Sequence, residues 1–431
     1  MWEKIIQVYH HKDLRKKILY TLLLLIIFRL AAHLPVPGVN LENLKSFFAR
    51  NQIFGLLDVF SGGAMSSFSV VMMGVAPYIN ASIIMQLLTM IIPRLESLSK
   101  EGEEGQRVIN RYTRLLTVPL AALQSFGMIK LLQSQSEKGL KIIGYLNPFQ
   151  MVTIIITITA GTIFLMWLGE LMTENGIGNG ISLIITVGIL ARLPIQAVRM
   201  FSSAISTTDI LKSLLFLILA ILIIFGVVIV VEGQRNIPIS YAKRIRGQRM
   251  YGGVSTYLPL RVNQGGVIPI IFAMSLMMFP GVIARFFTTA KSAWLANSAS
   301  WLEKAFRPET VFYGLIYFLL VVGFNYFYTA IIFNPINIAE NIQKQGGFIP
   351  GIRPGEKTVE YLSKVSNRIM LAGGIFLGII AILPFIVQAI MGIGSMLDII
   401  GGTSLLIVVS VALETIEQLK SQLIMRSYEE L

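Results

Sequence analysis

Few residues in this sequence have the types and spacing that catalysis or metal binding requires. The chain has three histidines, His10, His11 and His33, and no cysteine, so thiolate metal sites and disulfides are excluded and a histidine metal site is not expected. No Ser/His/Asp arrangement and no pair of carboxylates at catalytic spacing stands out. We therefore predict that the chain is not an enzyme and that it uses no metal and no cofactor.

The Gly-rich run GFIPGIRPGEKT superficially resembles a phosphate-binding loop. In that loop a glycine directly precedes the lysine, and the loop joins a strand to a helix. Here Glu356 separates Gly355 from Lys357, and the run follows a polar segment. Nucleotide binding is not expected, so a partner must supply the energy for any transport against a gradient.

Charged residues within or beside apolar runs are the usual sign of a transporter or pump. Here they are few: Arg29 lies near the end of the first run, and Glu170 and Glu232 lie where runs stop. Such residues commonly extend their charged ends to the membrane interface. This pattern argues against ion-coupled transport of a small charged substrate.

The elements that carry these residues are those of a polytopic membrane protein. The chain has 431 residues, of which 54% are hydrophobic and only 14% charged, a balance that a soluble protein of this size could not bury. We expect an all-α fold with about ten transmembrane helices, each near the usual spanning length. The expected spans are residues 18–32, 70–92, 112–132, 150–169, 181–193, 211–231, 266–286, 311–333, 369–390 and 399–413.

Lysine and arginine are concentrated on one side of this predicted topology. They lie in the N-terminal segment, in the loops after the even-numbered spans and in the C-terminal tail, so the positive-inside rule places both termini in the cytoplasm. The two longest polar loops, residues 232–264 and 334–368, also fall on that side. Ten spans can divide into pseudo-symmetric halves, an N-terminal half over 1–198 and a C-terminal half over 210–431.

One stretch departs from the regular spans. Residues 58–68, rich in Ser, Gly and Ala, are about the length of half a membrane helix, and an apolar run follows directly. Backbone breaks at membrane depth only where protein or water covers its polar groups, so a broken span hints at a cavity. We expect a half-length helix here, before a full span over 70–92.

Three functional interpretations remain open at this point. The first is a channel. The second is a secondary transporter with a broken-helix substrate site, which requires a buried carboxylate for ion coupling. The third is a scaffold or insertase without a conducting pore.

Several motifs, in order along nearly the whole chain, together resemble the SecY/Sec61-alpha family, whose bacterial member is the channel subunit of the Sec translocon. They are LPVPG, DVFSGGAMS, APYINASIIMQLL, EGEEGQR, FLMWLGELMTENGIGNGISLII, YAKR, LPLRVNQGGVIPIIFA, FYTAIIFNP, GGFIPGIRPGEKT and GGTSLLIVV. The resemblance implies ten helices in two pseudo-symmetric halves, spans one to five and six to ten, around a central hourglass pore.

The resemblance also implies functional positions. The pore ring matches Val75, Ile79, Ile181, Ile185, Ile271 and Ile407. The plug that closes the outer funnel matches residues 58–68, with Asp58, Ser61, Gly62, Gly63, Ala64, Met65, Ser66 and Phe68. The lateral gate, between spans two and three and spans seven and eight, includes Asn80 and Phe279. The docking surface for a motor or ribosome includes Lys243, Arg244, Arg246, Arg249, Arg353 and Lys357.

The activity implied is that of a protein-conducting channel in the bacterial plasma (inner) membrane. It translocates unfolded secretory polypeptides across the membrane and releases transmembrane segments laterally into it. The implied partners are SecE-like and SecG-like small membrane subunits, the SecA motor ATPase, the ribosome, signal sequences and nascent polypeptides, and anionic lipid. For the basic loops, the plain alternative is topology and contact with lipid headgroups.

Overall fold

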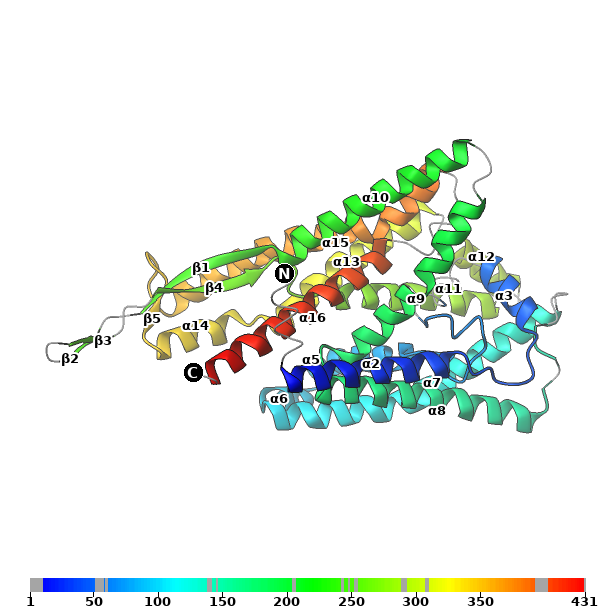
Figure 1. The fold of residues 1–431 in the computed structure, drawn as a ribbon, viewed down its shortest axis with the longest axis horizontal. Coiled ribbons are helices and arrows are strands. Elements are labelled where there is room, and N and C mark those ends of the chain that lie inside the picture. The colour runs from blue at the N-terminus through cyan, green and yellow to red at the C-terminus, as the bar shows by residue number, and fades with distance from the viewer. Residues whose placement is uncertain are drawn as a thin grey trace. The chain divides into compact units, whose positions relative to one another are not determined.

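The computed structural model is mostly helical (Figure 1). It describes residues 11–50, 58, 61–137, 142–144, 146–203, 207–241, 244–246, 249–251, 255–287, 293–306, 310–391 and 402–429. The chain divides into two compact units. Unit 1 comprises Met1–Leu214 and Gly392–Leu431, and unit 2 comprises Leu215–Met391.

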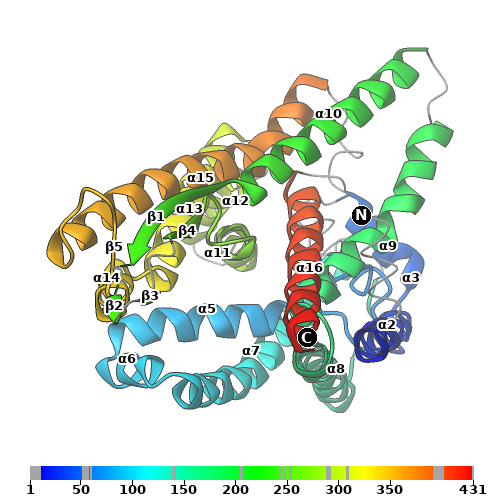
Figure 2. The same ribbon diagram turned by 60° about the vertical axis from the view of Figure 1, so that its left-hand side comes forward.

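Unit 1 is built from helices and holds the N-terminal spans together with the last one. Its helices are α2 (Lys12–Ala32), α3 (Leu41–Arg50), α5 (Ala76–Ile91), α6 (Pro93–Lys100), α7 (Glu103–Glu137), α8 (Pro148–Asn175), α9 (Gly180–Ser203) and α16 (Gly402–Glu429). Helix α8 packs against α2, α7 and α9, and α16 packs against α9 (Figure 2). The C-terminal helix therefore joins the N-terminal unit, whereas the division into halves over 1–198 and 210–431 stays a prediction about symmetry.

Unit 2 combines helices with two small sheets. Its elements are β1 (Gln234–Tyr241), β2 (Arg244–Arg246), β3 (Arg249–Tyr251), β4 (Ser255–Arg261), α11 (Ile268–Phe287), α12 (Ala293–Ala305), α13 (Val311–Ile332), α14 (Pro335–Lys344), β5 (Gly347–Phe348) and α15 (Glu356–Met391). Helix α10 (Thr207–Glu232) begins in unit 1 and lies mostly in unit 2. Helix α13 packs against both α11 and α15.

Each of the ten expected spans coincides with a helix, namely α2, α5, α7, α8, α9, α10, α11, α13, α15 and α16. This agreement has a physical basis, because a membrane span must satisfy its own backbone hydrogen bonds. By length and composition alone, 4 helices of the described part qualify as membrane spans, on α7, α8, α13 and α15, or up to 5 if the pair α5–α6 is one bent span. Helices α5 and α6 meet at 102°, and Pro93 begins α6 (Figure 2).

The half-length helix expected over 58–68 is wrong for residues 61–68, which form consecutive turns. Gly62 and Gly63 have φ of +67° and +91°, and Phe68 has φ of +44°, so the backbone leaves the right-handed helical region three times. The turns continue to Val75, and the second span begins at Ala76 instead of residue 70.

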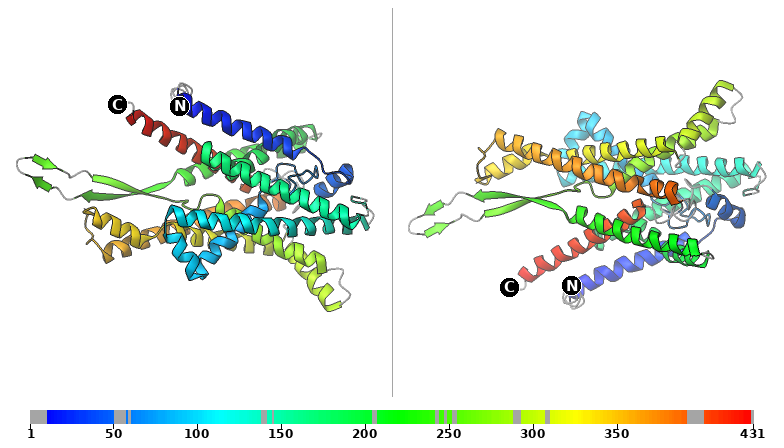
Figure 3. Two further views of the ribbon diagram at one scale, coloured as in Figure 1. Left: turned by 90° about the horizontal axis from the view of Figure 1, so that it is seen from below. Right: turned by 90° about the horizontal axis from the view of Figure 1, so that it is seen from above.

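The two long polar loops fold into one module of unit 2 (Figure 3). Strands β1 and β4 form an antiparallel hairpin with Gln234 opposite Arg261, and β5 from the second loop pairs with the other edge of β1. Strands β2 and β3 form a separate two-stranded pair. The sheet and helices share a core that consists of Ile237, Leu260, Ala339, Ile349, Leu362 and Val365.

Candidate functional site

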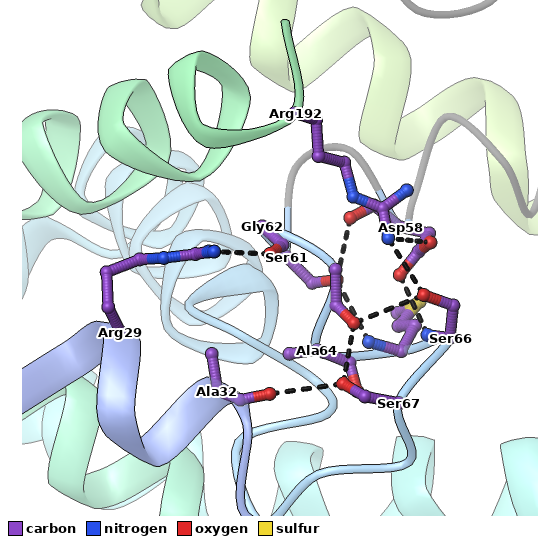
Figure 4. A network of polar contacts seen from close by, with 11 residues as sticks. Arg29, Ala32, Asp58, Ser61, Gly62, Ala64, Ser66, Ser67 and Arg192 are labelled. Atoms are coloured by element: carbon purple, nitrogen blue, oxygen red, sulfur yellow. Dashed lines mark hydrogen bonds and ion pairs between the residues drawn. The ribbon is translucent and has the colours of Figure 1, made fainter. Parts of the chain in front are cut away.

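The segment over residues 58–68, which we call the plug segment although its role stays a prediction, is organised around Asp58 (Figure 4). The Asp58 backbone carbonyl accepts hydrogen bonds from the Ser61 hydroxyl at 3.0 Å and from the Gly63 N–H at 2.8 Å. One carboxylate oxygen accepts the Ser66 N–H at 2.8 Å, and the other forms an ion pair with Arg192 of α9. Asp58 thereby ties both ends of the turn together and links the segment to a membrane helix.

The guanidinium of Arg192 bridges two groups of the plug segment. Besides the Asp58 carboxylate, it donates to the Ser66 hydroxyl at 2.8 Å. The Asp58 side chain is only 3% exposed and that of Arg192 is 23% exposed, so the pair is largely shielded from water. A buried carboxylate is tolerated only when it is paired and hydrogen-bonded, and this one is both. We name the contacts of Arg192 with Asp58 and Ser66 the plug clasp.

Helix α2 holds the opposite side of the segment. Arg29 donates from Nη1 to the Gly62 carbonyl at 2.8 Å, and the Ser67 hydroxyl lies 3.1 Å from the Ala32 carbonyl (Figure 4). The Val36 N–H donates to the Phe68 carbonyl at 2.8 Å, just beyond α2. The sequence pattern predicts an interfacial role for Arg29, whereas its side chain binds the plug backbone.

Two glycines make this close fit possible. A Cβ on Gly62 would lie 2.8 Å from the Gly188 Cα of α9, and a Cβ on Gly63 would lie 2.8 Å from Nη2 of Arg192. Real Cβ atoms do not approach so closely, and both glycines have positive φ. The Ser/Gly composition of the segment therefore reflects its seat against α2 and α9.

Apolar side chains hold the inner face of the segment. Met65 is 3% exposed and Phe68 is fully buried, and both join a core with Met72, Leu132 and Ile158. Exposing each of these two side chains costs about 1.5–3 kcal/mol. Met65 and Phe68 therefore anchor the segment together with the plug clasp.

The predicted pore-ring residues lie on four helices or their ends. Val75 precedes α5 and Ile79 lies in its first turn, Ile181 and Ile185 lie on α9, Ile271 lies on α11, and Ile407 lies on α16. Val75, Ile185 and Ile407 are buried. The Ile181 side chain packs against Gly169 of α8, because a Cβ at Gly169 would lie 2.4 Å from its Cδ1. Five members belong to unit 1 and Ile271 belongs to unit 2, so the closed ring stays a prediction.

The two predicted gate residues also belong to different units. Asn80 is half-buried on α5, which packs against α7 in unit 1. Phe279 lies on α11, directly before Pro280, and α11 packs against α13 in unit 2; the side chain of Phe279 lies outside the described part. Their shared role in a gate stays a prediction.

Arg353 is exposed on a tight turn between β5 and α15. Gly351 and Gly355 flank it with φ of +82° and +100°, and the Thr358 hydroxyl donates to the Arg353 carbonyl at 3.0 Å. The turn is therefore fixed while the Arg353 side chain stays exposed.

Lys357, on the first turn of α15, forms an ion pair within its own helix. It pairs with Glu360 at 2.9 Å, and this hydrogen bond raises the pKa of Lys357 and lowers the pKa of the Glu360 carboxyl. Arg244, Arg246 and Arg249 lie on β2 and β3, but their side chains are not described, and Lys243 lies outside the described residues. The docking role of all these residues stays a prediction.

The sequence reasoning missed Arg192. A signal was available, because Arg192 lies within the run ILARLPIQ, and an arginine inside a predicted membrane helix is a candidate functional residue by default. Only the fold reveals its partner, since the two members of the ion pair are 134 positions apart in the sequence.

Comparison with known proteins identifies the relatives of this chain. The family model SecY matches residues 69–416. The chain is 44% identical over 428 residues to the protein translocase subunit SecY of Streptomyces galbus, an alignment that covers 97% of this chain and 96% of the relative. It is 45% identical over 434 residues to the same subunit of Mycobacterium tuberculosis (strain ATCC 25618 / H37Rv), with the same coverage.

Solved structures share the fold at lower sequence identity. A protein-conducting channel aligns with a TM-score of 0.62 and 18% identity. A SecY protein whose plug domain is described as stabilising the closed state of the translocation channel aligns with a TM-score of 0.63 and 19% identity. Sec61 from the canine ribosome-channel complex of the endoplasmic reticulum aligns with 0.61 and 18%. Each alignment covers 94% of this chain and 91% of the other.

Proposed function

The chain belongs to the SecY family, and we propose that it forms a protein-conducting channel that moves unfolded secretory polypeptides across the membrane and releases hydrophobic segments sideways. The observation that carries this proposal is the similarity to SecY translocase subunits over 97% of the chain. These relatives are translocase subunits, so the comparisons give no support to the alternative of a secondary transporter.

The plug segment supports a closed resting state. It is held by the plug clasp, by Arg29 and by two buried apolar side chains, all within unit 1. A ligand therefore displaces the segment only if its preference for the open state outweighs these contacts. We propose that a signal sequence supplies this preference by binding at a gate that includes Asn80 and Phe279.

The pore ring provides the second barrier. Branched aliphatic side chains that face a narrow pore form an apolar constriction that excludes water and ions. Their side chains make no hydrogen bonds, so they yield around any passing sequence. We assign this role to Val75, Ile79, Ile181, Ile185, Ile271 and Ile407.

The sheet module of unit 2 is the proposed docking surface. Strands β1 and β4 share a core with α14 and α15, and β5 pairs with β1, so parts of both polar loops pack together. The outward-facing Arg353 suits an acidic protein face or ribosomal RNA. We propose that a SecA motor or a ribosome docks here, and that SecE-like and SecG-like subunits complete the assembly.

The proposed orientation of the chain in the membrane follows from the distribution of lysine and arginine. We propose a bacterial inner-membrane location with both termini in the cytoplasm, since lysine and arginine concentrate in the N-terminal segment and in the even-numbered loops. Anionic lipid on that side is a further proposed partner.

The test is protein translocation in a reconstituted system. The full chain and its small partner subunits are placed in vesicles with a SecA motor, ATP and a polypeptide that carries a signal sequence. We expect the polypeptide to become protected from external protease, whereas the same polypeptide without its signal sequence stays accessible. Lack of protection for both polypeptides, together with specific uptake of a small solute, would contradict the proposal and restore the transporter alternative.

A further inference from the structure

Helix α12 presents two tryptophans to its surroundings. Trp294 is 77% exposed and Trp301 is 65% exposed, although tryptophan is highly buried on average. They are seven residues apart and therefore share one face of the helix. On the opposite side Ala299 is buried, and α12 packs against α11. The chain has only 4 tryptophans, so half of them lie on this 13-residue helix.

The other exposed residues described on α12 are polar, and they include one cation. Asn297 and Ser298 lie between the two indoles, and Lys304 follows in the last turn. A face made of indoles, small polar groups and one terminal cation suits neither bulk water nor the hydrocarbon core. It matches the headgroup region of a bilayer, where the indole body meets acyl chains and its N–H finds a hydrogen-bond acceptor.

The position of α12 along the chain also favours the headgroup region of a bilayer. It follows α11 and precedes α13, and the neighbouring ends of these helices expose Phe287, Val311 and Phe312. Val311 is 87% exposed at the first position of an apolar helix. The tryptophans therefore lie close in sequence to exposed apolar side chains at the ends of α11 and α13.

Helix α12 is also tied firmly to the start of α13. The Thr310 hydroxyl, which accepts the Tyr313 N–H as the N-cap of α13, lies 2.8 Å from the Ala305 carbonyl at the end of α12. The rings of Phe306 and Phe312 meet edge to face with centroids 6.0 Å apart. A force on α12 is thus transmitted to the end of a membrane helix.

We propose that α12 lies in the interfacial layer of the leaflet opposite the chain termini, and that Trp294 and Trp301 anchor the ends of α11 and α13 there. Seven expected spans precede α12, which places it on that side of the membrane. The partner is the bilayer interface itself, namely phospholipid headgroups and the adjoining acyl segments. Such an anchor fixes the depth of α11, the helix that carries Phe279, whether or not the gate proposed above is correct.

Tryptophan fluorescence in vesicles tests this proposal. The full chain with Trp2→Phe and Trp167→Phe retains only the two α12 indoles. We expect blue-shifted emission, weak quenching by aqueous iodide, strongest quenching by lipids brominated near the headgroup, and weaker quenching by lipids brominated near the chain ends. The matched control replaces all four tryptophans by Phe and adds Leu319→Trp, about 12 Å along α13 from Val311. Its quenching should show the reverse order of the two brominated lipids.

Two outcomes would overturn the proposal. Strongest quenching by iodide would place the indoles in water, and no quenching by either lipid or iodide would show that protein covers them. The absence of cysteine permits a second measurement that leaves every tryptophan in place. A nitroxide spin label on the cysteine of Ser298→Cys should lie at interfacial depth, where oxygen and an aqueous nickel chelate raise its relaxation rate to a comparable extent. A rise caused by the chelate alone would also overturn the proposal.

Discussion

Replacing Arg192 by alanine removes the cation that pairs with the Asp58 carboxylate in the closed seat of the plug segment. Asp58 then keeps one N–H donor, from Ser66, while its side chain stays almost completely shielded from water. Removing one partner of a fully buried pair costs about 3–5 kcal/mol. Because the side chain of Arg192 is 23% exposed, we reduce this value to about 2–4 kcal/mol for the closed seat.

This cost falls on the closed state alone, because the plug clasp breaks when the segment leaves. Each 1.4 kcal/mol changes an equilibrium tenfold, so the ratio of open to closed channels should rise by about 30- to 700-fold. The assay is ion conductance of single channels in a planar bilayer, read as the fraction of time spent open. Asp58→Asn should act in the same direction, since it also removes the ion pair.

A double-mutant cycle separates the plug clasp from general destabilisation. Asp58→Asn combined with Arg192→Ala leaves no unpaired charge, so we expect the double variant to leak less than the sum of the two single effects predicts. The matched control is Arg114→Ala, which breaks the 2.6 Å ion pair with Glu170 between α7 and α8, away from the plug segment. An unchanged open fraction in Arg192→Ala, or an equal rise in Arg114→Ala, would refute the reasoning.

Three further predictions follow from the same structure. Gly63→Ala places a Cβ against the guanidinium of Arg192 at a backbone φ of +91°, so we expect the ion leak to rise about tenfold. The control is Gly351→Ala, at a solvent-facing glycine that also has positive φ, and an equal leak in the two variants would contradict this prediction. Ile271→Asn introduces a polar group into the proposed pore ring, so conductance of the idle channel should rise. An effect no larger than that of Leu276→Asn, at an exposed position of the same helix, would remove Ile271 from the ring. Arg353→Glu reverses the exposed charge on the turn before α15. The fraction of polypeptide that the motor moves into the vesicles, and thus protects from protease, should fall while the amount of channel protein in the membrane stays constant. Normal translocation would exclude Arg353 from docking.

The sequence is most informative about the membrane helices. Lipid forces each span to be both apolar and helical, so each of the ten apolar runs overlaps a helix, although only four helices of the described part, or up to five, are long and apolar enough to qualify as spans. The largest extensions are at α16, which continues to Glu429 whereas the expected span ends at residue 413, and at α15, which begins at Glu356 whereas the apolar run begins at residue 369. The first turns of this helix are polar because they pack on the sheet module and not in lipid.

The sequence is least informative where conformation depends on distant partners. The turns of 61–68 replace a helix because Gly62 and Gly63 adopt positive φ and fit against Gly188 and Arg192, which lie on another helix. The pairing of β1 with β5 joins segments over 100 residues apart, and no local pattern predicts it. The charged stretch after the second span, expected as a loop, instead forms α6 and the start of α7.

Ion conductance before and after deletion of residues 62–68 tests the central claim most directly. The purified full chain, in a planar bilayer, should be nearly silent, because the plug segment and the pore ring both block the pore. The deletion removes Gly62, Gly63, Met65 and Phe68, and with them most of the contacts that seat the segment. We predict frequent opening of a large conductance in the deleted chain. Silence in both proteins would contradict a pore closed by this segment.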